Sequence, residues 1–476
     1  MGKLSKNVII YFIGNIINRF MGVLVTLFAT HILTNKEDLG YFNYVSSSSN
    51  LILTIFCLQI WMAIIRFIFD YKSIKNKLKI ITNGYFIGFL SFTIYLILLI
   101  IYCIIKSYAI WLFLELFFLG FSYVFNQMVQ FSCRGLAKNK LYVLSGVVSS
   151  IFYLVSSVIM MVVFKMTSSA LILSTAISYI SQGIFIEFFL NSFKKTKLKY
   201  LDFKIIKKML KFSIPTTINS VAYIFNQSAY IWLLNFFYDK SAIGAFTPAF
   251  RMTSLIGLFV MSFNFAFQEY SFYVNKSKFK YKIYNKNFNY FFRFISSGTI
   301  ILLPATCIFF SFMIGSTYKD AKILIPILYL GSILESLQIF LGSIMQAEKK
   351  VIPMFFSQIF GSFITIIVMF ISTKYIGLQS AGLSMAVCFL TITILRLIFL
   401  KYKIKLKFKA GFLLHFIPIY LLTTIVYLKY NAIINGLYLI LTFFYFVICN
   451  KNLFLKLIIN YSKKNKNNNN NKIKSL

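Results

Sequence analysis

The sequence predicts an all-α, polytopic membrane protein with about fourteen transmembrane helices. Hydrophobic residues make up 59% of the 476 residues and charged residues only 13%, whereas soluble proteins average roughly 45–50% and 25%. The apolar residues also fall in blocks of about 20, the length that a helix needs to cross a hydrocarbon core. Helices are expected because backbone groups in lipid must be hydrogen-bonded within their own segment.

Each predicted span is an apolar block between two polar or basic segments. Aromatic residues make up 19% of the chain; they suit lipid-facing surface, and tyrosine at span ends suits the membrane interface. In order along the chain, the predicted spans are 8–33, 41–68, 80–105, 108–132, 141–164, 170–192, 210–238, 243–270, 290–315, 323–347, 351–373, 380–400, 411–429 and 433–450.

The distribution of basic residues predicts the orientation in the membrane. With the N-terminus in the cytoplasm, the cytoplasmic segments hold 38 of the 49 Lys and Arg residues, and the opposite side holds 8. Cytoplasmic loops are enriched in Lys and Arg, so both termini are expected in the cytoplasm. Basic loops beside anionic lipid also account for the net charge of +38, and nucleic-acid binding is not expected.

Signals for an enzyme, a metal or a cofactor do not occur. The six cysteines fall in predicted spans or, for Cys133, directly after one, without a CxxC pair, and the two histidines are not at ligand spacing. The chain has no GxxxxGK[ST] loop and no arrangement typical of a Ser-His-Asp triad. We therefore predict a protein that is not an enzyme and that uses neither a cofactor nor a metal.

Two pairs of similar segments predict that the chain arose by internal duplication. The segment "DLGYF" at Asp38–Phe42 returns as "AIGAF" at Ala242–Phe246, 204 residues later, and both follow a short outer turn. A Leu-Gly pair at Leu119 and another at Leu330 are each followed by a basic pair at the cytoplasmic end of a span. Repeats with an even number of spans share one orientation. The predicted organisation is a lobe at 1–200, a second lobe at 201–400, two further helices at 401–450 and a Lys/Asn-rich tail at 451–476.

Four segments carry a resemblance to a known family. They are "ILTNKEDLGYFNY" after the first span, "AIIRF" at Ala63–Phe67, "RGLAKNK" after the fourth span and "FSIPTTIN" at Phe212–Asn219. In this order, the chain resembles the polysaccharide-export branch of the multidrug/oligosaccharidyl-lipid/polysaccharide (MOP) exporter superfamily over about residues 1–400. The resemblance implies two six-helix bundles in a V shape around a central cavity, working by alternating access.

The resemblance also implies a function, that of an O-antigen flippase. Such a protein moves an oligosaccharide on a polyprenyl diphosphate carrier from the cytoplasmic to the periplasmic leaflet of the bacterial inner membrane. Its partners are then the lipid-linked oligosaccharide and the bilayer, with a polysaccharide polymerase and a chain-length regulator as further candidates.

A diphosphate in a low-dielectric region needs fixed cations. The candidates are Arg19 midway through the first span, Arg251 in the eighth and Arg66 at the end of the second. Each has a simpler alternative: Arg19 could pair with Glu115, Arg251 could extend to the interface, and Arg66 has Asp70 one turn away.

The acids Glu115 and Glu335 are candidates for ion coupling or for purely structural roles. Amides and hydroxyls that could replace water around sugars lie on one stripe of the first span, including Asn15, and on the seventh span at Asn219, Tyr223, Asn226 and Gln227.

The turn after the first predicted span holds Glu37 and Asp38 side by side, although the chain has only 11 acidic residues. We interpret these acids as topology and turn chemistry on the non-cytoplasmic side. Gly40 is expected to supply a positive φ in a tight turn.

Three other functions stay open. A cation-coupled drug exporter of the same superfamily would typically place an acid in its first or seventh span, and neither span has one before Asp239. A peptidoglycan-precursor flippase calls for several arginines in the first two spans. A membrane glycosyltransferase would need a large outer loop, and no outer loop here exceeds about a dozen residues.

Overall fold

The computed structural model describes residues 20–107, 110–274, 277–348, 350–404, 410–429 and 431–451. These residues form helices joined by short connections, without a strand among them. Eleven of the described helices are long and apolar enough to cross a membrane, or up to twelve if a bent pair counts as one span. The prediction of an all-α, multi-pass membrane protein is confirmed, whereas the count of fourteen stays a prediction.

The helices follow the predicted spans in order. They are Phe20–Ile32, α2 (Lys36–Phe56), α3 (Ile60–Ile68), α4 (Ile74–Ile105), α5 (Ile110–Gly135), α6 (Asn139–Val162), α7 (Ser168–Leu190), α8 (Ser192–Lys195), η1 (Leu198–Tyr200), α9 (Phe203–Phe237), α10 (Lys240–Val274), α11 (Lys280–Met313), η2 (Ser316–Leu324), α12 (Ile325–Ala347), α13 (Val351–Ile376), α14 (Gln379–Ile404), α15 (Ala410–Lys429) and Ala432–Lys451.

Several helices begin well before the apolar block that predicted them. Helix α9 begins at Phe203 and α11 at Lys280, although hydropathy placed the spans at 210 and 290. The extra turns are rich in lysine, which is a good helix former but does not belong to the apolar core. Hydropathy therefore locates the part of a helix that lies in lipid and misses its basic extension.

The second predicted span is not one helix. It divides into α2 and α3, which are bent by 58° at a short break. At the break, Leu58 and Gln59 both have a φ of 48°, a left-handed conformation that costs a residue with a side chain about 1–2 kcal/mol. Backbone strain of this kind inside a span is held in place by the packing around it.

We expect Gln59→Gly to keep or slightly raise the melting temperature of the purified protein. Glycine adopts a positive φ without strain, and this gain offsets the about 0.5–1 kcal/mol that its flexibility costs. The control is Ser47→Gly in the regular part of α2, which should lower stability by about 0.5 kcal/mol. Equal losses in the two variants, measured by thermal unfolding in detergent, would contradict the assignment of strain to Gln59.

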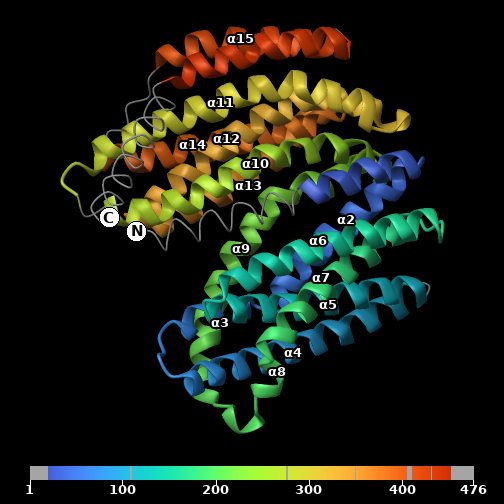
Figure 1. Ribbon diagram of the computed structural model, residues 1–476, viewed down its shortest axis with the longest axis vertical. Coiled ribbons are helices and arrows are strands. Elements are labelled where there is room, and N and C mark those ends of the chain that lie inside the picture. The colour runs from blue at the N-terminus through green and yellow to red at the C-terminus, as the bar shows by residue number, and fades with distance from the viewer. Residues whose placement is uncertain are drawn as a thin grey trace, which may run out of the picture.

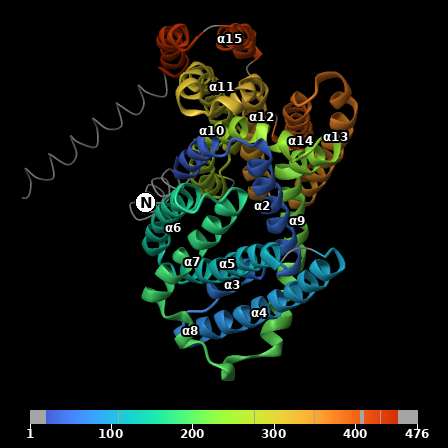
Figure 2. The same cartoon turned by 90° about the vertical axis from the view of Figure 1, so that its right-hand side faces the viewer.

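The helices form two groups that are distinct in Figure 1. Helices α3 to α8 lie together in the lower part of the picture, and α10 to α15 lie in the upper part. Helix α2 packs against α5 and α7 of the first group and, most extensively, against α10 of the second. Helix α9 contacts α3 and α4 near its start and α13 further along, and in Figure 2 it runs steeply between the groups.

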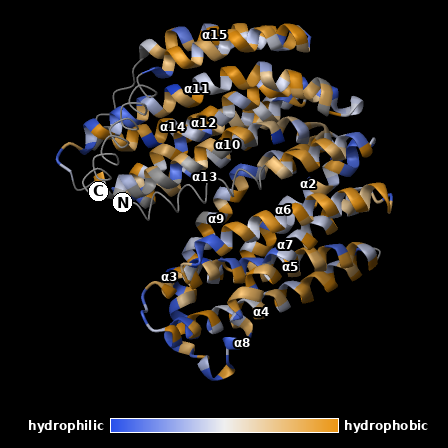
Figure 3. Cartoon of the chain, viewed as in Figure 1, coloured by the Kyte–Doolittle hydropathy of each residue, from blue (hydrophilic) through white to orange (hydrophobic). Residues whose placement is uncertain are grey.

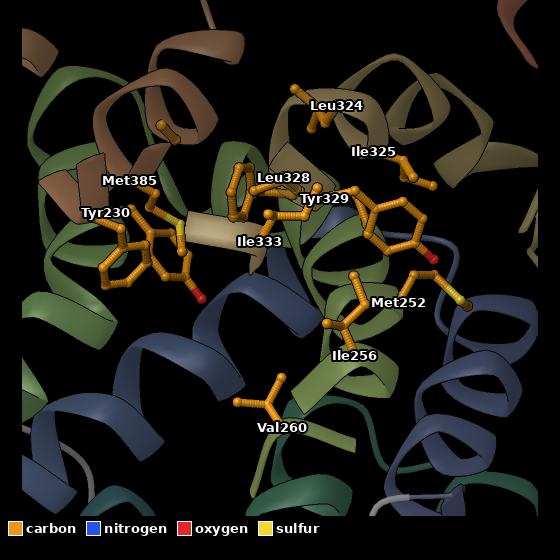
Figure 4. Packing of buried hydrophobic residues seen from close by; sticks show 14 of the residues in the cluster. Tyr230, Met252, Ile256, Val260, Leu324, Ile325, Leu328, Tyr329, Ile333 and Met385 are labelled. Atoms are coloured by element: carbon orange, nitrogen blue, oxygen red, sulfur yellow. The ribbon is translucent and has the colours of Figure 1, made fainter. Parts of the chain in front are cut away.

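The fold contains two large apolar cores, and the larger one extends from the second group into α5, α6 and α7 of the first. The larger core contains buried residues of α9, α10, α12 and α14, and Figure 4 shows Tyr230, Met252, Leu328 and Met385 among them. A second core lies among α3, α4 and α5 and includes Met209 from α9. Outside these cores many large apolar side chains are exposed, and Figure 3 shows hydrophobic residues over most of the helix lengths, as expected for surfaces that face lipid.

The two groups meet where α2 and α10 begin, which we call the joined end. Gly40 and Gly244 allow the contact: a Cβ on Gly40 would lie 1.6 Å from the carbonyl oxygen of Lys240, and one on Gly244 would lie 1.8 Å from that of Lys36. Asn43 Nδ2 donates to Thr247 Oγ1 at 3.0 Å, again between residues 204 apart. The two similar segments noted in the sequence are therefore in contact with each other.

The structure corrects the role expected for Gly40. Gly40 lies inside α2, and Gly377 is the described glycine with a positive φ, so the prediction of a left-handed turn is wrong. Glycine is needed because a backbone from the other group takes the place of a side chain. Glu37 and Asp38 lie in the first turn of α2, where Asn35 Oδ1 accepts from Glu37 N at 3.0 Å and acids interact favourably with the helix dipole.

A further contact holds the joined end. A Cβ on Gly315 would lie 1.8 Å from the carbonyl oxygen of Thr30, and the Gly315 amide donates to Thr30 Oγ1 at 3.3 Å. The Tyr318 hydroxyl donates to the carbonyl oxygens of Leu33, at 3.0 Å, and Asn35, at 3.2 Å. These backbone contacts close the joined end over the turn that precedes α2.

Candidate functional site

A polar cavity of about 330 Å³ lies between the two groups of helices. One wall is α2, whose sequence "YVSSSSN" places four serines and an asparagine inside a span. Ser46, Ser47, Ser49 and Asn50 line the cavity. Hydroxyls and amides in this number cost free energy in lipid unless they are hydrogen-bonded. This face of α2 is therefore suited to contact a polar ligand and not lipid.

The other walls come from four helices. Helices α5 and α7 contribute Tyr123, Thr175 and Tyr179, α9 contributes Gln227, Ser228 and Tyr230, and α10 contributes Thr247, Phe250 and Arg251. The cavity therefore combines hydroxyls, amides and aromatic rings, which are the groups that bind sugars by replacing water and by packing against their apolar faces.

Arg251 is the charged residue among the described lining residues. It lies on α10 one turn after Thr247 and is half-buried. It shares the cavity with the phenol groups of Tyr123, Tyr179 and Tyr230. A guanidinium surrounded by hydroxyls in a low-dielectric region is well suited to bind a phosphate oxygen.

Two hydrogen bonds hold α2 in place between the groups. Tyr123 on α5 donates to Asn50 Oδ1 at 3.0 Å, and Trp232 Nε1 on α9 donates to Ser48 Oγ at 3.0 Å. Together with the Asn43 to Thr247 bond, they connect the serine-rich helix to both walls. The polar face of α2 is therefore fixed toward the cavity.

The structure brings together part of the predicted site. Arg251 and Gln227 both line the cavity. Gln227 Nε2 donates to Glu335 Oε1 at 2.5 Å and to the Tyr223 hydroxyl at 3.3 Å, so a predicted amide, acid and phenol form one cluster on α9 and α12. Tyr223 is 38% exposed and lies beside the cavity lining rather than in it.

Two predicted residues do not face the cavity. Asn226 is buried, and its amide donates to the Gln358 carbonyl oxygen at 3.0 Å and accepts from Ser362. Adjacent residues on a helix point about 100° apart, so Asn226 faces α13 when Gln227 faces the cavity. Arg66 Nη1 pairs with Asp70 at 2.6 Å on the surface, and Arg66 does not line this cavity.

Other predicted residues lie outside what the structure describes. Asn15 and Arg19 precede its first described residue, and the side chain of Asn219 is not described either. Glu115 is described: it is 3% exposed on α5, and its Oε1 has no hydrogen-bond partner among the described residues. A buried carboxyl with an unbonded oxygen is costly, so Glu115 remains a candidate for ion coupling.

Sequence reasoning missed most of the cavity wall. The serine run of α2 and the residues Tyr123, Thr175 and Tyr179 were not predicted. The serine run could have been found, because four consecutive hydroxyls in a span exceed what lipid-facing packing needs. The tyrosine and threonine positions have no such signal, since the same residue types occur throughout the spans.

A second intramembrane arginine has a structural role. Arg396 on α14 is 3% exposed; its Nε donates to Ser357 Oγ at 3.2 Å, its Nη2 donates to Gln358 Oε1 at 3.0 Å, and its Nη1 donates to the Gln338 carbonyl oxygen. These acceptors lie on α12 and α13. Arg396 therefore connects three helices of the second group away from the cavity.

We expect Arg396→Met to lower the stability of the protein by about 1–3 kcal/mol, because it leaves buried acceptors without a donor. Transport should fall only in proportion to the amount of folded protein. Thermal unfolding and transport per folded molecule, each compared with the exposed control Lys374→Ala, check this. A normal melting temperature combined with lost transport would instead give Arg396 a direct role.

Solved structures share this fold. "Lipid II flippase MurJ, inward closed conformation" aligns with a TM-score of 0.69 and 18% identity, covering 94% of this chain and 100% of that one. An inward-facing multidrug resistance MATE family transporter of the MOP superfamily aligns with a TM-score of 0.65 and 14% identity, over 82% and 94%. An outward-facing MATE structure gives 0.59 and 17%, over 84% and 96%.

This chain therefore has the fold of these flippase and transporter structures. A family model described as "Polysaccharide biosynthesis protein" matches residues 4–267, more than half of the chain. The chain belongs to this polysaccharide biosynthesis protein family. Among curated proteins, none matches the sequence.

Proposed function

We propose that this protein is a flippase that moves a polyprenyl-diphosphate-linked oligosaccharide, an O-antigen or related surface polysaccharide unit, from the cytoplasmic to the periplasmic leaflet of the inner membrane. The observation that carries the proposal is Arg251 in a cavity lined mainly by hydroxyls, amides and aromatic rings. The cation suits a diphosphate, and the neutral polar groups suit sugars. The family match supports the same class of substrate.

The orientation proposed from the basic loops places the joined end on the periplasmic side. Glycan-diphosphate then enters the cavity from the cytoplasmic side, while the polyprenyl chain stays in lipid. Separation of Gly40 from Gly244 and of Gly315 from Thr30 opens the periplasmic side. In this mechanism Arg19 is a second proposed cation, and Glu115 and Glu335 are proposed acids for ion coupling.

Two related functions are alternatives within the superfamily. A peptidoglycan-precursor flippase would also use a cationic cavity, and one aligned structure is a lipid II flippase. A drug exporter for cationic compounds would need a carboxylate where Arg251 lies, and the described lining residues include no acid. The lining therefore favours an anionic head group over a cationic drug.

The leaflet that holds the lipid-linked glycan tests the proposal. In a strain that lacks the gene, we expect completed repeat units to accumulate facing the cytoplasm and the surface polymer to disappear from a gel. Accumulation of peptidoglycan precursor with cell lysis would identify the second candidate. Unchanged surface polysaccharide together with increased sensitivity to cationic dyes would refute the flippase assignment in favour of drug export.

A further inference from the structure

A second cavity, of about 480 Å³, lies on the other side of α2. It is a groove between α2, α4 and α5, closed at the joined end by the first residue of α10. Its walls are mainly apolar, with Ile52, Phe56, Leu98 and Leu116 among them. Several of these side chains are also exposed, Leu98 by 44% and Ile52 by 41%, so the groove opens toward the membrane.

Among the residues that the structure describes, the groove has one cation, which lies at one of its ends. Lys240 is exposed and is the charged residue among the described lining residues. Its Nζ lies 4.8 Å from the centroid of the Tyr41 ring, and Tyr102 lines the same end. Phe56 follows Tyr41 by four helical turns, so the apolar walls reach about 22 Å along α2 from the cation.

The groove and the polar cavity share one helix wall. Ser49 lines both of them, and Ser48 lines the groove while its hydroxyl accepts from Trp232 of α9. A lipid whose head group leaves the cavity at the joined end therefore reaches Lys240 with its chain beside α2. The two sites are placed for the two parts of one amphipathic molecule.

We infer that this groove binds the single isoprenoid chain of the lipid-linked product, with its phosphate on Lys240. The inference rests on the proposed function, because it assigns the groove to the transported lipid. The groove pairs one cation with one apolar channel. A polyprenyl lipid has one chain for its phosphates, whereas a phospholipid would bring two chains to the same cation.

Photolabelling of the full-length protein tests the inference. The purified protein is placed in phosphatidylcholine nanodiscs with a photoactivatable polyprenyl phosphate, and labelled peptides are mapped by mass spectrometry. We expect saturable labelling of α2 and α4 around Ile52 and Leu98. Leu98→Trp fills the groove and should lower labelling about tenfold, equivalent to about 1.4 kcal/mol of binding free energy. The matched control is Ile97→Trp, because Ile97 is the adjacent lipid-facing residue, 52% exposed, and does not line the groove.

A second comparison tests the cation. Lys240→Gln should lower labelling by the phosphate probe and leave labelling by a neutral polyprenol probe unchanged. Equal labelling by a photoactivatable phosphatidylglycerol at the same mole fraction would overturn the inference in favour of a general lipid site. Unchanged labelling in Leu98→Trp would overturn it as well.

The two proposals can fail separately. Arg251→Ala removes the cavity cation and should leave the groove labelled as in the wild type. If the gene-deletion strain keeps its surface polysaccharide while groove labelling remains specific, the flippase assignment falls and the isoprenoid site stands. If glycan accumulates in the cytoplasmic leaflet but Leu98→Trp is labelled normally, the groove assignment falls alone.

Discussion

Replacing Arg251 with alanine is expected to lower transport of the lipid-linked glycan by about tenfold to a hundredfold, because a charge-assisted hydrogen bond contributes about 1.5–3 kcal/mol. Arg251 is the cation of the described cavity lining, so no other described side chain there can replace its charge. The measurement is the initial rate of glycan appearance in the periplasmic leaflet, at matched protein levels.

Two further variants separate charge from geometry. Arg251→Lys keeps the positive charge but loses the planar fork that binds two phosphate oxygens at once, so we expect intermediate transport. Arg134→Ala removes an arginine that lies over the rings of Phe131 and Tyr142 at the end of α5, and it should transport normally. Wild-type rates in Arg251→Ala would remove the diphosphate site from this cavity.

The second large effect is expected at the joined end. Even alanine at Gly40 would place its Cβ 1.6 Å from the carbonyl oxygen of Lys240, a distance that requires α2 and α10 to move apart. We expect Gly40→Ala to hold the joined end open and to abolish transport, because the cycle requires both states. Gly244→Ala should have the same effect, since the contact is reciprocal.

Accessibility of the cavity measures this opening. A cysteine introduced at Ser46, which lines the cavity, should react with a membrane-impermeant thiol reagent from the periplasmic side. We expect the labelling rate to rise roughly tenfold or more in Gly40→Ala, because a minor open state becomes the main one. Gly22→Ala is the control, since a Cβ there would have no neighbour within 4 Å. Equal labelling and normal transport in all variants would show that the joined end is not a gate.

The fold class could be predicted from the sequence because lipid imposes one strong rule, a long apolar helix for each crossing. Structural details that depend on contacts with other helices could not be predicted from the sequence. The spacing of apolar residues does not reveal the break at Leu58 and Gln59, because the sequence around both residues is apolar enough for one continuous span. Likewise, Asn226 and Gln227 are equally polar in the sequence, and only their helix neighbours decide which of them faces the cavity.

Gly40 was singled out in the sequence for a reason that the structure corrects. The similarity of "DLGYF" and "AIGAF" pointed to Gly40 and Gly244, and the structure places their backbones in contact. One sequence offered a local explanation, a positive φ, because close approach of a distant backbone cannot be seen from neighbouring residues. The site was predicted only in part: Arg251 stood out as a charge within a span, whereas the tyrosines around it could not be distinguished among the 31 tyrosines of the chain.

The contact between Gly40 and Gly244 also bears on how such a chain could arise. If the two halves descend from one duplicated gene, the ancestral half met a second copy of itself through this same patch, as an isologous dimer does. Glycine suits that origin, because two copies of the same helix can bring their backbones into contact where neither has a side chain. In the present chain the carbonyl oxygens of Lys240 and Lys36 lie where side chains of Gly40 and Gly244 would be, so neither half can gain bulk there on its own.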